Sequence, residues 1–113
     1  MGVVKELEVQ RGDVVLVSLH PAKGSEIRKT RPRIIISPDE LNVHLNTFIV
    51  APLTTGSHPY PFRLPCQFEG KAGFVVLDQI RAVDRARLVR RLGTLSPQIL
   101  GRILETLQEM FAP

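Results

Sequence analysis

The sequence has little cysteine and no tryptophan: one Cys and no Trp in 113 residues. Cys66 has no second cysteine to pair with and no neighbouring histidines at zinc-ligand spacing, which excludes an intrachain disulfide and a cysteine-based zinc site. We therefore expect no metal, no other cofactor and a reducing, cytoplasmic environment. The first residues also lack a long apolar stretch, so we expect no attachment to a membrane.

Aromatic side chains are scarce as well, with five Phe and one Tyr. Proteins that bind single strands without base-specific hydrogen bonds usually stack bases on several aromatic rings. So few rings exclude extensive stacking of that kind. Tyr60 and Phe62 are expected to pack in the core or at an interface.

The length and the apolar content of 43% fit one compact domain. We expect this domain to span residues 1–113, with 1–10 as a partly ordered N-terminal segment. A single domain leaves no room for separate binding and catalytic units, so one core has to support both. A homodimer interface would bury additional apolar surface.

Positive charge is in modest excess, with 15 Lys and Arg against 11 Asp and Glu and a net charge of +4. Its distribution is more informative than its sum, because basic residues gather in two short segments, 23–33 and 81–91. Such segments are suited to a polyanion such as a nucleic acid. A pair of solvated surfaces explains them equally well.

Short apolar runs separated by Pro and Gly predict a mainly β protein. The expected strands are residues 14–19, 32–37, 47–51, 62–66, 73–77, 78–83 and 87–92. A turn is expected at 11–13, a single helical turn at 39–42, an exposed loop at 20–30 and a rigid proline-rich loop at 52–61. Loops such as these usually carry function.

The C-terminal segment changes to a helical period. Ser96 is suited to an N-cap and Pro97 to the first helical position. Apolar residues follow at helical spacing: Leu100, Ile103, Leu104, Leu107 and Phe111. Strands followed by one amphipathic helix predict an α+β, mainly β fold, an SH3-like antiparallel barrel whose open side the helix covers.

Several ordered motifs resemble the MazF/PemK toxin family. They are Arg11-Gly12-Asp13-Val14, Pro21-Ala22-Lys23-Gly24-Ser25-Glu26, Thr30-Arg31-Pro32, Ile49-Val50-Ala51-Pro52-Leu53-Thr54-Thr55, Tyr60-Pro61-Phe62 and Leu77-Asp78-Gln79-Ile80-Arg81. The similarity runs from Arg11 to Phe111, and several motifs in order are far more specific than one. The resemblance implies a CcdB/PemK-like barrel, a homodimer, sequence-specific cleavage of single-stranded messenger RNA and inhibition by a cognate antitoxin protein.

The family's catalytic pair corresponds to Arg31 and Thr54 in this sequence. Candidate RNA-binding residues are Lys23, Glu26, Lys29, Thr55, His58, Gln79 and Arg81. Ile27 departs from the family pattern, which often has Gln there, so the base preference and the antitoxin contact are expected to differ. His58 has no second positioned histidine, and a lone loop histidine is more often simply exposed.

Cleavage without a metal is chemically reasonable because RNA carries its own nucleophile, the 2′-hydroxyl. The enzyme has to move two protons and stabilise the charge that builds on phosphorus. The guanidinium of Arg31 matches phosphate oxygens and stays charged, which suits it to stabilisation better than to acid catalysis. The hydroxyl of Thr54 is suited to positioning the phosphate or relaying a proton.

Other interpretations remain open. Arg31 could form a surface salt bridge to Glu26, and the hydroxyl of Thr54 could bond local backbone in a turn. A noncatalytic toxin on the same fold, like the CcdB-type toxins that poison DNA gyrase, is one alternative function. A plain RNA- or DNA-binding barrel is another, because fold alone does not determine function.

Overall fold

The computed structural model describes residues 8–18, 30–55 and 59–113. Its strands are β1 (Asp13–Ser18), β2 (Thr30–Ile35), β3 (Thr47–Thr55), β4 (Arg63–Phe68), β5 (Lys71–Val76), β6 (Arg81–Asp84) and β7 (Leu88–Thr94). The helical segments are α1 (Asp39–Asn42), η1 (Leu77–Gln79), η2 (Arg85–Arg87) and α2 (Pro97–Phe111). This agrees with the predicted mainly β protein with a C-terminal helix.

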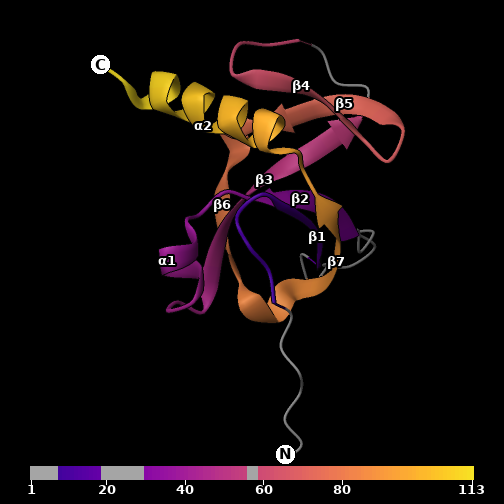
Figure 1. The fold of residues 1–113 in the computed structure, drawn as a ribbon, viewed down its shortest axis with the longest axis vertical. Coiled ribbons are helices and arrows are strands. Elements are labelled where there is room, and N and C mark those ends of the chain that lie inside the picture. Colours follow the sequence, from indigo (N-terminus) through magenta and orange to yellow (C-terminus); the bar gives the residue numbers. More distant parts are fainter. Residues whose placement is uncertain (1–7, 19–29, 56–58) are drawn as a thin grey trace, which may run out of the picture.

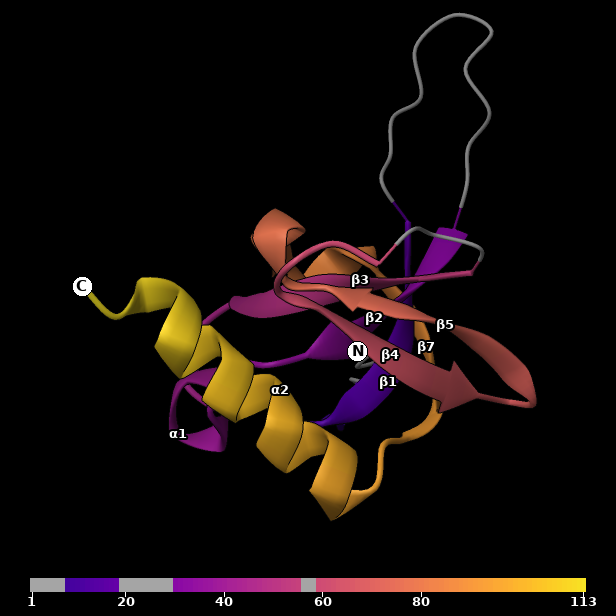
Figure 2. The same cartoon turned by 90° about the horizontal axis from the view of Figure 1, so that it is seen from above.

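All the strand pairs are antiparallel, and the sheet has the order β4-β5-β3-β2-β1-β7, with β6 also paired to β3. β3 is the longest strand and changes partners along its length. Its first six residues pair with β6 and β2, and its last three residues pair with β5. Figures 1 and 2 show β3 passing through the centre of the molecule toward β4 and β5.

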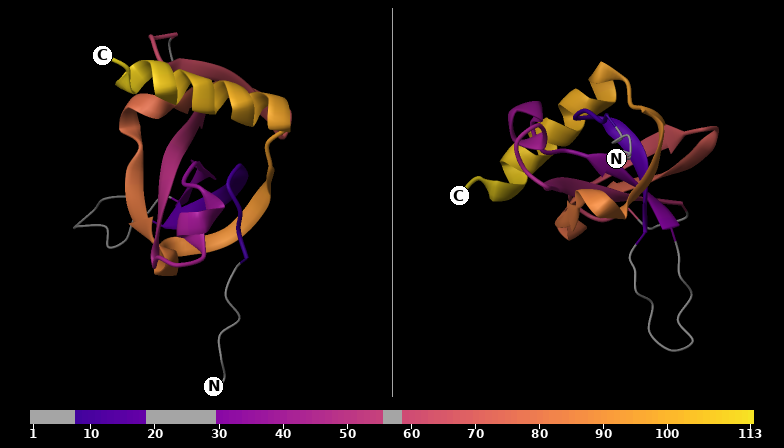
Figure 3. Two further views of the ribbon diagram at one scale, coloured as in Figure 1. Left: turned by 60° about the vertical axis from the view of Figure 1, so that its left-hand side comes forward. Right: turned by 90° about the horizontal axis from the view of Figure 1, so that it is seen from below.

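Alternation along the strands places apolar side chains on both faces of the sheet, and each face has its own core. One core includes Val14, Ile34, Leu77 and Ile103, and the other includes Val15, Ile35, Phe48 and Val83. Helix α2 belongs to the first core and lies across one end of the curved sheet (Figure 3).

The predicted start of the C-terminal helix is confirmed. The hydroxyl of Ser96 accepts a hydrogen bond from the backbone N–H of Ile99 at 3.2 Å, and Pro97 begins the helix. The predicted apolar stripe is wrong at its end, since Phe111 is 69% exposed. Met110, the preceding residue, packs against the core instead. The C-terminal end of α2 extends past the sheet (Figure 1).

The predicted turn at 11–13 is confirmed, and its residues form hydrogen bonds with β2 and β7. Gly12 adopts a φ of 93°, which favours glycine, and its N–H donates to the carbonyl of Ile35 at 2.7 Å. The buried carboxylate of Asp13 accepts hydrogen bonds from the N–H of Gln10 and the hydroxyl of Thr94, each at 2.8 Å. The motif is therefore structural.

The proline-rich loop predicted at 52–61 is wrong at its beginning, because residues 52–55 continue β3. Proline usually interrupts a ladder because it has no N–H. Pro52 is nevertheless paired with Arg33, at the point where β3 leaves β2 and begins to pair with β5. Thr54 consequently lies in a strand and not in a loop.

Smaller corrections concern the second half of the chain. Residues 78 and 79 belong to η1 instead of a strand, and Arg87 belongs to η2. Tyr60 and Phe62 are 55% and 41% exposed, so neither packs in the core of this chain. The expected loop at 20–30 and the N-terminal segment lie largely outside the described residues. In the described part of the chain, no helix is long and apolar enough to cross a membrane.

Candidate active site

The candidate catalytic residues lie where β2 and β3 separate. The ladder between these strands runs from the Ile35–Val50 pair to the Arg33–Pro52 pair. Beyond it, Arg31 is paired with Val17 of β1 and Thr54 with Phe74 of β5. Residues two apart in a strand share a face, so Arg31 and Thr54 continue the face on which Arg33 lies opposite Pro52.

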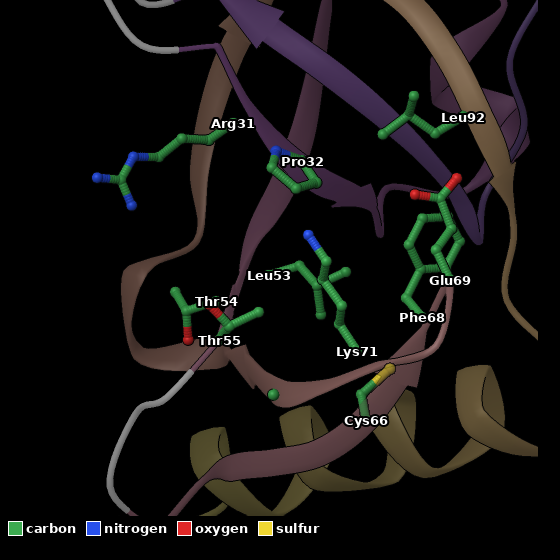
Figure 4. Close-up of a pocket in the computed structure, with 11 residues that line it drawn as sticks. Arg31, Pro32, Leu53, Thr54, Thr55, Cys66, Phe68, Glu69, Lys71 and Leu92 are labelled. Atoms are coloured by element: carbon green, nitrogen blue, oxygen red, sulfur yellow. The ribbon is translucent and has the colours of Figure 1, made fainter. Parts of the chain in front are cut away.

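A cavity of about 310 Å³ opens at this point, and both candidate catalytic residues line it. In Figure 4, Arg31, Thr54 and Thr55 lie on one side of the cavity, whereas Phe68, Glu69 and Leu92 lie on the other. The remaining lining residues are Pro32, Leu53, Cys66, Lys71 and Gly73. The structure therefore brings the predicted pair to one cavity with an apolar floor and a charged rim.

The hydroxyl of Thr54 is buried and has no hydrogen-bond partner among the described residues. The alternative in which it bonds local backbone in a turn is therefore wrong. Buried hydroxyls are rarely left without a partner, and an exception calls for an explanation such as a ligand. A bound substrate could provide the missing hydrogen-bond partner of the Thr54 hydroxyl.

Gly73 determines where the backbone of Thr54 can lie. A Cβ placed on Gly73 would be 1.7 Å from the carbonyl oxygen of Thr54, far inside any possible contact. No residue with a side chain fits there without moving β3 or β5. The close approach of these strands therefore requires glycine at this position.

Arg31 is exposed, whereas Arg33 on the same face is only 5% exposed and its Nε makes no hydrogen bond to any described residue. Burial lowers the pKa of the Arg33 guanidinium, and the positive charges of Arg81 and Arg31 lower it further. The cause of the last two effects is repulsion between cations. Arg33 shares a face of β2 with Arg31, and Arg81 of β6 lies on the same face of the sheet, opposite Val50 of β3.

The thiol of Cys66 is free and buried in the wall of the cavity. Burial raises its pKa, because a thiolate is less stable away from water. A thiol of this kind is a poor nucleophile, so Cys66 contributes apolar surface to the cavity and not chemistry.

Both residues of the Asp78-Gln79 motif are exposed, and Asp78 has a structural partner. Asp78 accepts two hydrogen bonds from Arg63, from Nε and Nη2, both at 2.9 Å. The hydrogen bond to Arg63 lowers the pKa of Asp78. Gln79 and Arg81 are exposed, as an RNA-binding residue has to be.

Four candidate RNA-binding residues, Lys23, Glu26, Lys29 and His58, lie outside the described residues, as does Ile27. The alternative in which Arg31 pairs with Glu26 is therefore untested. Thr55 is exposed at the end of β3 and lines the cavity. Within residues 8–18, 30–55 and 59–113, no group of His, Cys, Asp or Glu is arranged to hold a metal ion.

Sequence reasoning missed Arg33 and Gly73 as residues of this site. Arg33 was placed in a strand, but only as one member of a basic segment. The spacing of Arg31 and Arg33 in a strand is a usable signal, because it puts both on one face. No sequence signal identifies Gly73, since its close contact is with a residue of another strand.

Comparison with known proteins identifies the family. Residues 10–111 match the family of PemK-like, MazF-like toxins of type II toxin–antitoxin systems. The chain belongs to this family. The resemblance seen in the opening and Asp-Gln motifs is thereby confirmed.

Two individual relatives are similar in sequence over most of the chain. The endoribonuclease toxin ChpB of Escherichia coli K12 is 34% identical over 112 residues, which cover 93% of this chain and 96% of ChpB. The endoribonuclease toxin MazF of the same organism is 33% identical over 93 residues, covering 81% and 84%.

The fold is shared with solved structures. A mycobacterial endoribonuclease, solved in complex with its cognate antitoxin, superposes with a TM-score of 0.77 at 23% identity, covering 94% of this chain and 98% of its own. The mainly β antiparallel architecture with a C-terminal helix is therefore that of the MazF-like toxins.

Proposed function

We propose that this MazF-like toxin is an endoribonuclease that cleaves single-stranded RNA, and messenger RNA in particular, without a metal ion. The relatives ChpB and MazF are named endoribonuclease toxins. The observation that carries the proposal for this chain is the cavity where β2 and β3 separate, which Arg31 and Thr54 both line. The buried hydroxyl of Thr54 forms no hydrogen bond with any described residue.

In the proposed reaction the 2′-oxygen of one nucleotide attacks the adjacent phosphorus. A bond forms between the 2′-oxygen and phosphorus, and the bond from phosphorus to the 5′-oxygen of the next nucleotide breaks. The proton of the 2′-hydroxyl leaves, and a proton is delivered to the 5′-oxygen. The products are a 2′,3′-cyclic phosphate and a free 5′-hydroxyl.

Arg31 stabilises the negative charge that develops on the equatorial phosphate oxygens. Its planar guanidinium donates two hydrogen bonds in the geometry of a phosphate group. Such stabilisation is most effective where water is excluded, and bound RNA would exclude water from the exposed guanidinium of Arg31. Thr54 positions the phosphate and the 2′-hydroxyl, because its hydroxyl both donates and accepts and its backbone is fixed by β5.

The proposal includes two protein partners. A structural relative was solved in complex with its cognate antitoxin, which supports inhibition of this chain by an antitoxin of its own. We also propose a homodimer, which would cover exposed apolar residues such as Leu45, Phe62 and Val89. Contacts to bases are assigned to Glu26 and Gln79. Contacts to phosphates are assigned to Lys23, Lys29, His58 and Arg81, and Thr55 is assigned a further contact to the RNA.

The test is incubation of the purified protein with a long mixed-sequence RNA in excess chelator. We expect cleavage at a small set of sequences, with products that carry 2′,3′-cyclic phosphate and 5′-hydroxyl ends. Mapping of those ends also gives the sequence preference. Intact RNA in chelator that is cleaved after addition of a divalent metal would contradict the proposed chemistry. Binding without any cleavage would favour the noncatalytic alternatives.

A further inference from the structure

Arg33 is a buried cation whose role the proposed reaction leaves open. It lies in the middle of the sheet, paired with Val15 of β1 on one side and with Pro52 of β3 on the other. Its Nε makes no hydrogen bond, and in the described part of the chain no carboxylate forms an ion pair with it. A position with these neighbours ordinarily holds an apolar residue, as Ile35 does two residues later.

A guanidinium nitrogen that is buried without a hydrogen-bond partner is unfavourable, because it loses its contact with water and gains no acceptor in exchange. The neighbours of Arg33 increase this cost. Arg31 precedes it on the same face of β2, and Arg81 lies across β3, opposite Val50. Both repel it, as the lowered pKa of Arg33 reflects. Three guanidinium groups around one stretch of β3, with one of them buried, form a site that an anion would stabilise.

We propose that Arg33, flanked by Arg31 and Arg81, binds a backbone phosphate of the RNA strand, beside the scissile phosphate held by Arg31 and Thr54. This inference rests on the proposed function and extends it. All four side chains belong to the same face of β2, β3 and β6, so a strand that reaches Thr54 passes the arginines. The fork of a guanidinium matches two phosphate oxygens.

A carboxylate from a protein partner is the other anion that could fit. The position of Arg33 favours a phosphate, because it adjoins the two residues assigned to the scissile phosphodiester, and a nucleic acid presents further phosphates on both sides of that group. Contacts of this type fix the register of the strand without reading its bases. Arg33 is therefore expected to contribute to affinity for all RNA sequences alike.

The experiment measures binding of a 2′-O-methyl RNA oligonucleotide, which has no free nucleophile and cannot be cleaved. The variants are Arg33→Met, which keeps an unbranched apolar stem, and Arg33→Lys, which keeps the charge but not the fork. Arg102→Met, at an exposed position of α2, is the matched control. Dissociation constants are measured at several salt concentrations by fluorescence anisotropy.

We expect Arg33→Met to raise the Kd about 10-fold and to reduce the slope of log K against log salt by about 0.7, the value for one phosphate contact to a single strand. Arg33→Lys should weaken binding with the slope unchanged, and Arg102→Met should change neither quantity. Without RNA, Arg33→Met should unfold at the same temperature as the unaltered protein or higher. A purely structural arginine would instead lower the unfolding temperature and leave the Kd and the salt slope unchanged.

Unchanged affinity and slope in folded Arg33→Met overturn the proposal. If that variant does not fold, unchanged affinity in Arg33→Lys overturns it. A loss of affinity for an oligo-glutamate peptide but not for the RNA overturns it in favour of a protein partner. Because the probe cannot be cleaved, these outcomes are separate from the chelator test. Failure of the unaltered protein to bind the RNA would contradict the proposed function itself.

Discussion

The Cα of Gly73 and the carbonyl oxygen of Thr54 approach so closely that a Cβ on Gly73 would lie 1.7 Å from that oxygen. This contact joins β5 to the end of β3, where the candidate catalytic threonine lies. The backbone that carries the Thr54 hydroxyl can therefore lie where it does only opposite a residue that has no side chain.

Gly73→Ala is expected to lower both stability and cleavage. The added methyl group has to push the two strands apart, which costs about 1 to 3 kcal/mol of unfolding free energy. A shift of about 1 Å at Thr54 lowers the cleavage rate by up to about 100-fold. Chemical denaturation and a cleavage assay with a fluorogenic RNA measure the two effects.

The matched control for this change is Gly101→Ala in α2, where an added Cβ meets nothing within 4 Å. Alanine favours the helix over glycine, so this variant should gain about 0.5 to 1 kcal/mol and cleave RNA normally. Normal cleavage by Gly73→Ala would show that the position of Thr54 does not depend on the contact with Gly73.

Arg31→Ala is expected to reduce the cleavage rate by about 100- to 1,000-fold, the effect of removing one group that stabilises the transition-state charge. Arg31 is exposed, so the melting temperature should change little. Rates measured at saturating RNA separate this loss from weaker binding. Unaltered rates would remove Arg31 from the catalytic pair.

Thr54→Val should lower the cleavage rate by at least about 100-fold and stabilise the fold. Valine has the shape of threonine without the hydroxyl, and that hydroxyl is buried without a partner. Its removal is expected to raise the unfolding free energy by about 1 kcal/mol. Thr54→Ser, which restores the hydroxyl, should recover part of the rate. A valine variant that is less stable would indicate that the hydroxyl has a structural partner.

Asp13→Ala is expected to destabilise the protein by about 2 kcal/mol, because it removes a buried carboxylate that accepts two hydrogen bonds and forms an ion pair with Arg91 at 3.2 Å. The donors are the N–H of Gln10 and the hydroxyl of Thr94. Asp84→Ala is the control, since Asp84 is exposed and accepts one hydrogen bond, from the N–H of Ala86. It should cost about 1 kcal/mol or less. Equal losses in urea denaturation would contradict a special role for Asp13.

The Arg63–Asp78 pair predicts a dependence of stability on pH. The folded state lowers the pKa of Asp78 below its ordinary 3.8, so it binds the proton less tightly than the unfolded chain does. The stabilisation is fully present above that ordinary value and is lost as the pH falls through the lowered pKa. The difference in melting temperature between the unaltered protein and Asp78→Asn should therefore be constant at neutral pH and disappear in strong acid.

Arg63→Met should remove the same pH-dependent component as Asp78→Asn. The guanidinium of Arg63 also lies over the ring of Tyr60, 4.9 Å from its centroid, so the double variant should show no greater loss than Arg63→Met alone. Additive losses would show that the two residues act separately.

Local patterns in the sequence were sufficient for most of the secondary structure. Ser96 and Pro97 mark the start of α2 because a cap and a fixed φ act within one helical turn. The turn at Gly12 and the run of β-branched residues after it are sufficient to predict the strand β1. Arg31 and Thr54 were identified by resemblance to the family, not from any pattern in their own residue types.

Tertiary structure alone determined three features of the site. Pro52 and Thr54 belong to a strand because β5 supplies new partners where β2 separates from β3. Arg33 is buried because β1 and β3 flank it on both sides. Gly73 is required because of a residue 19 positions earlier in the chain. Propensity and periodicity report on neighbours along the chain, whereas burial, unpaired hydrogen-bonding groups and close backbone contacts depend on strands that meet only in the folded protein.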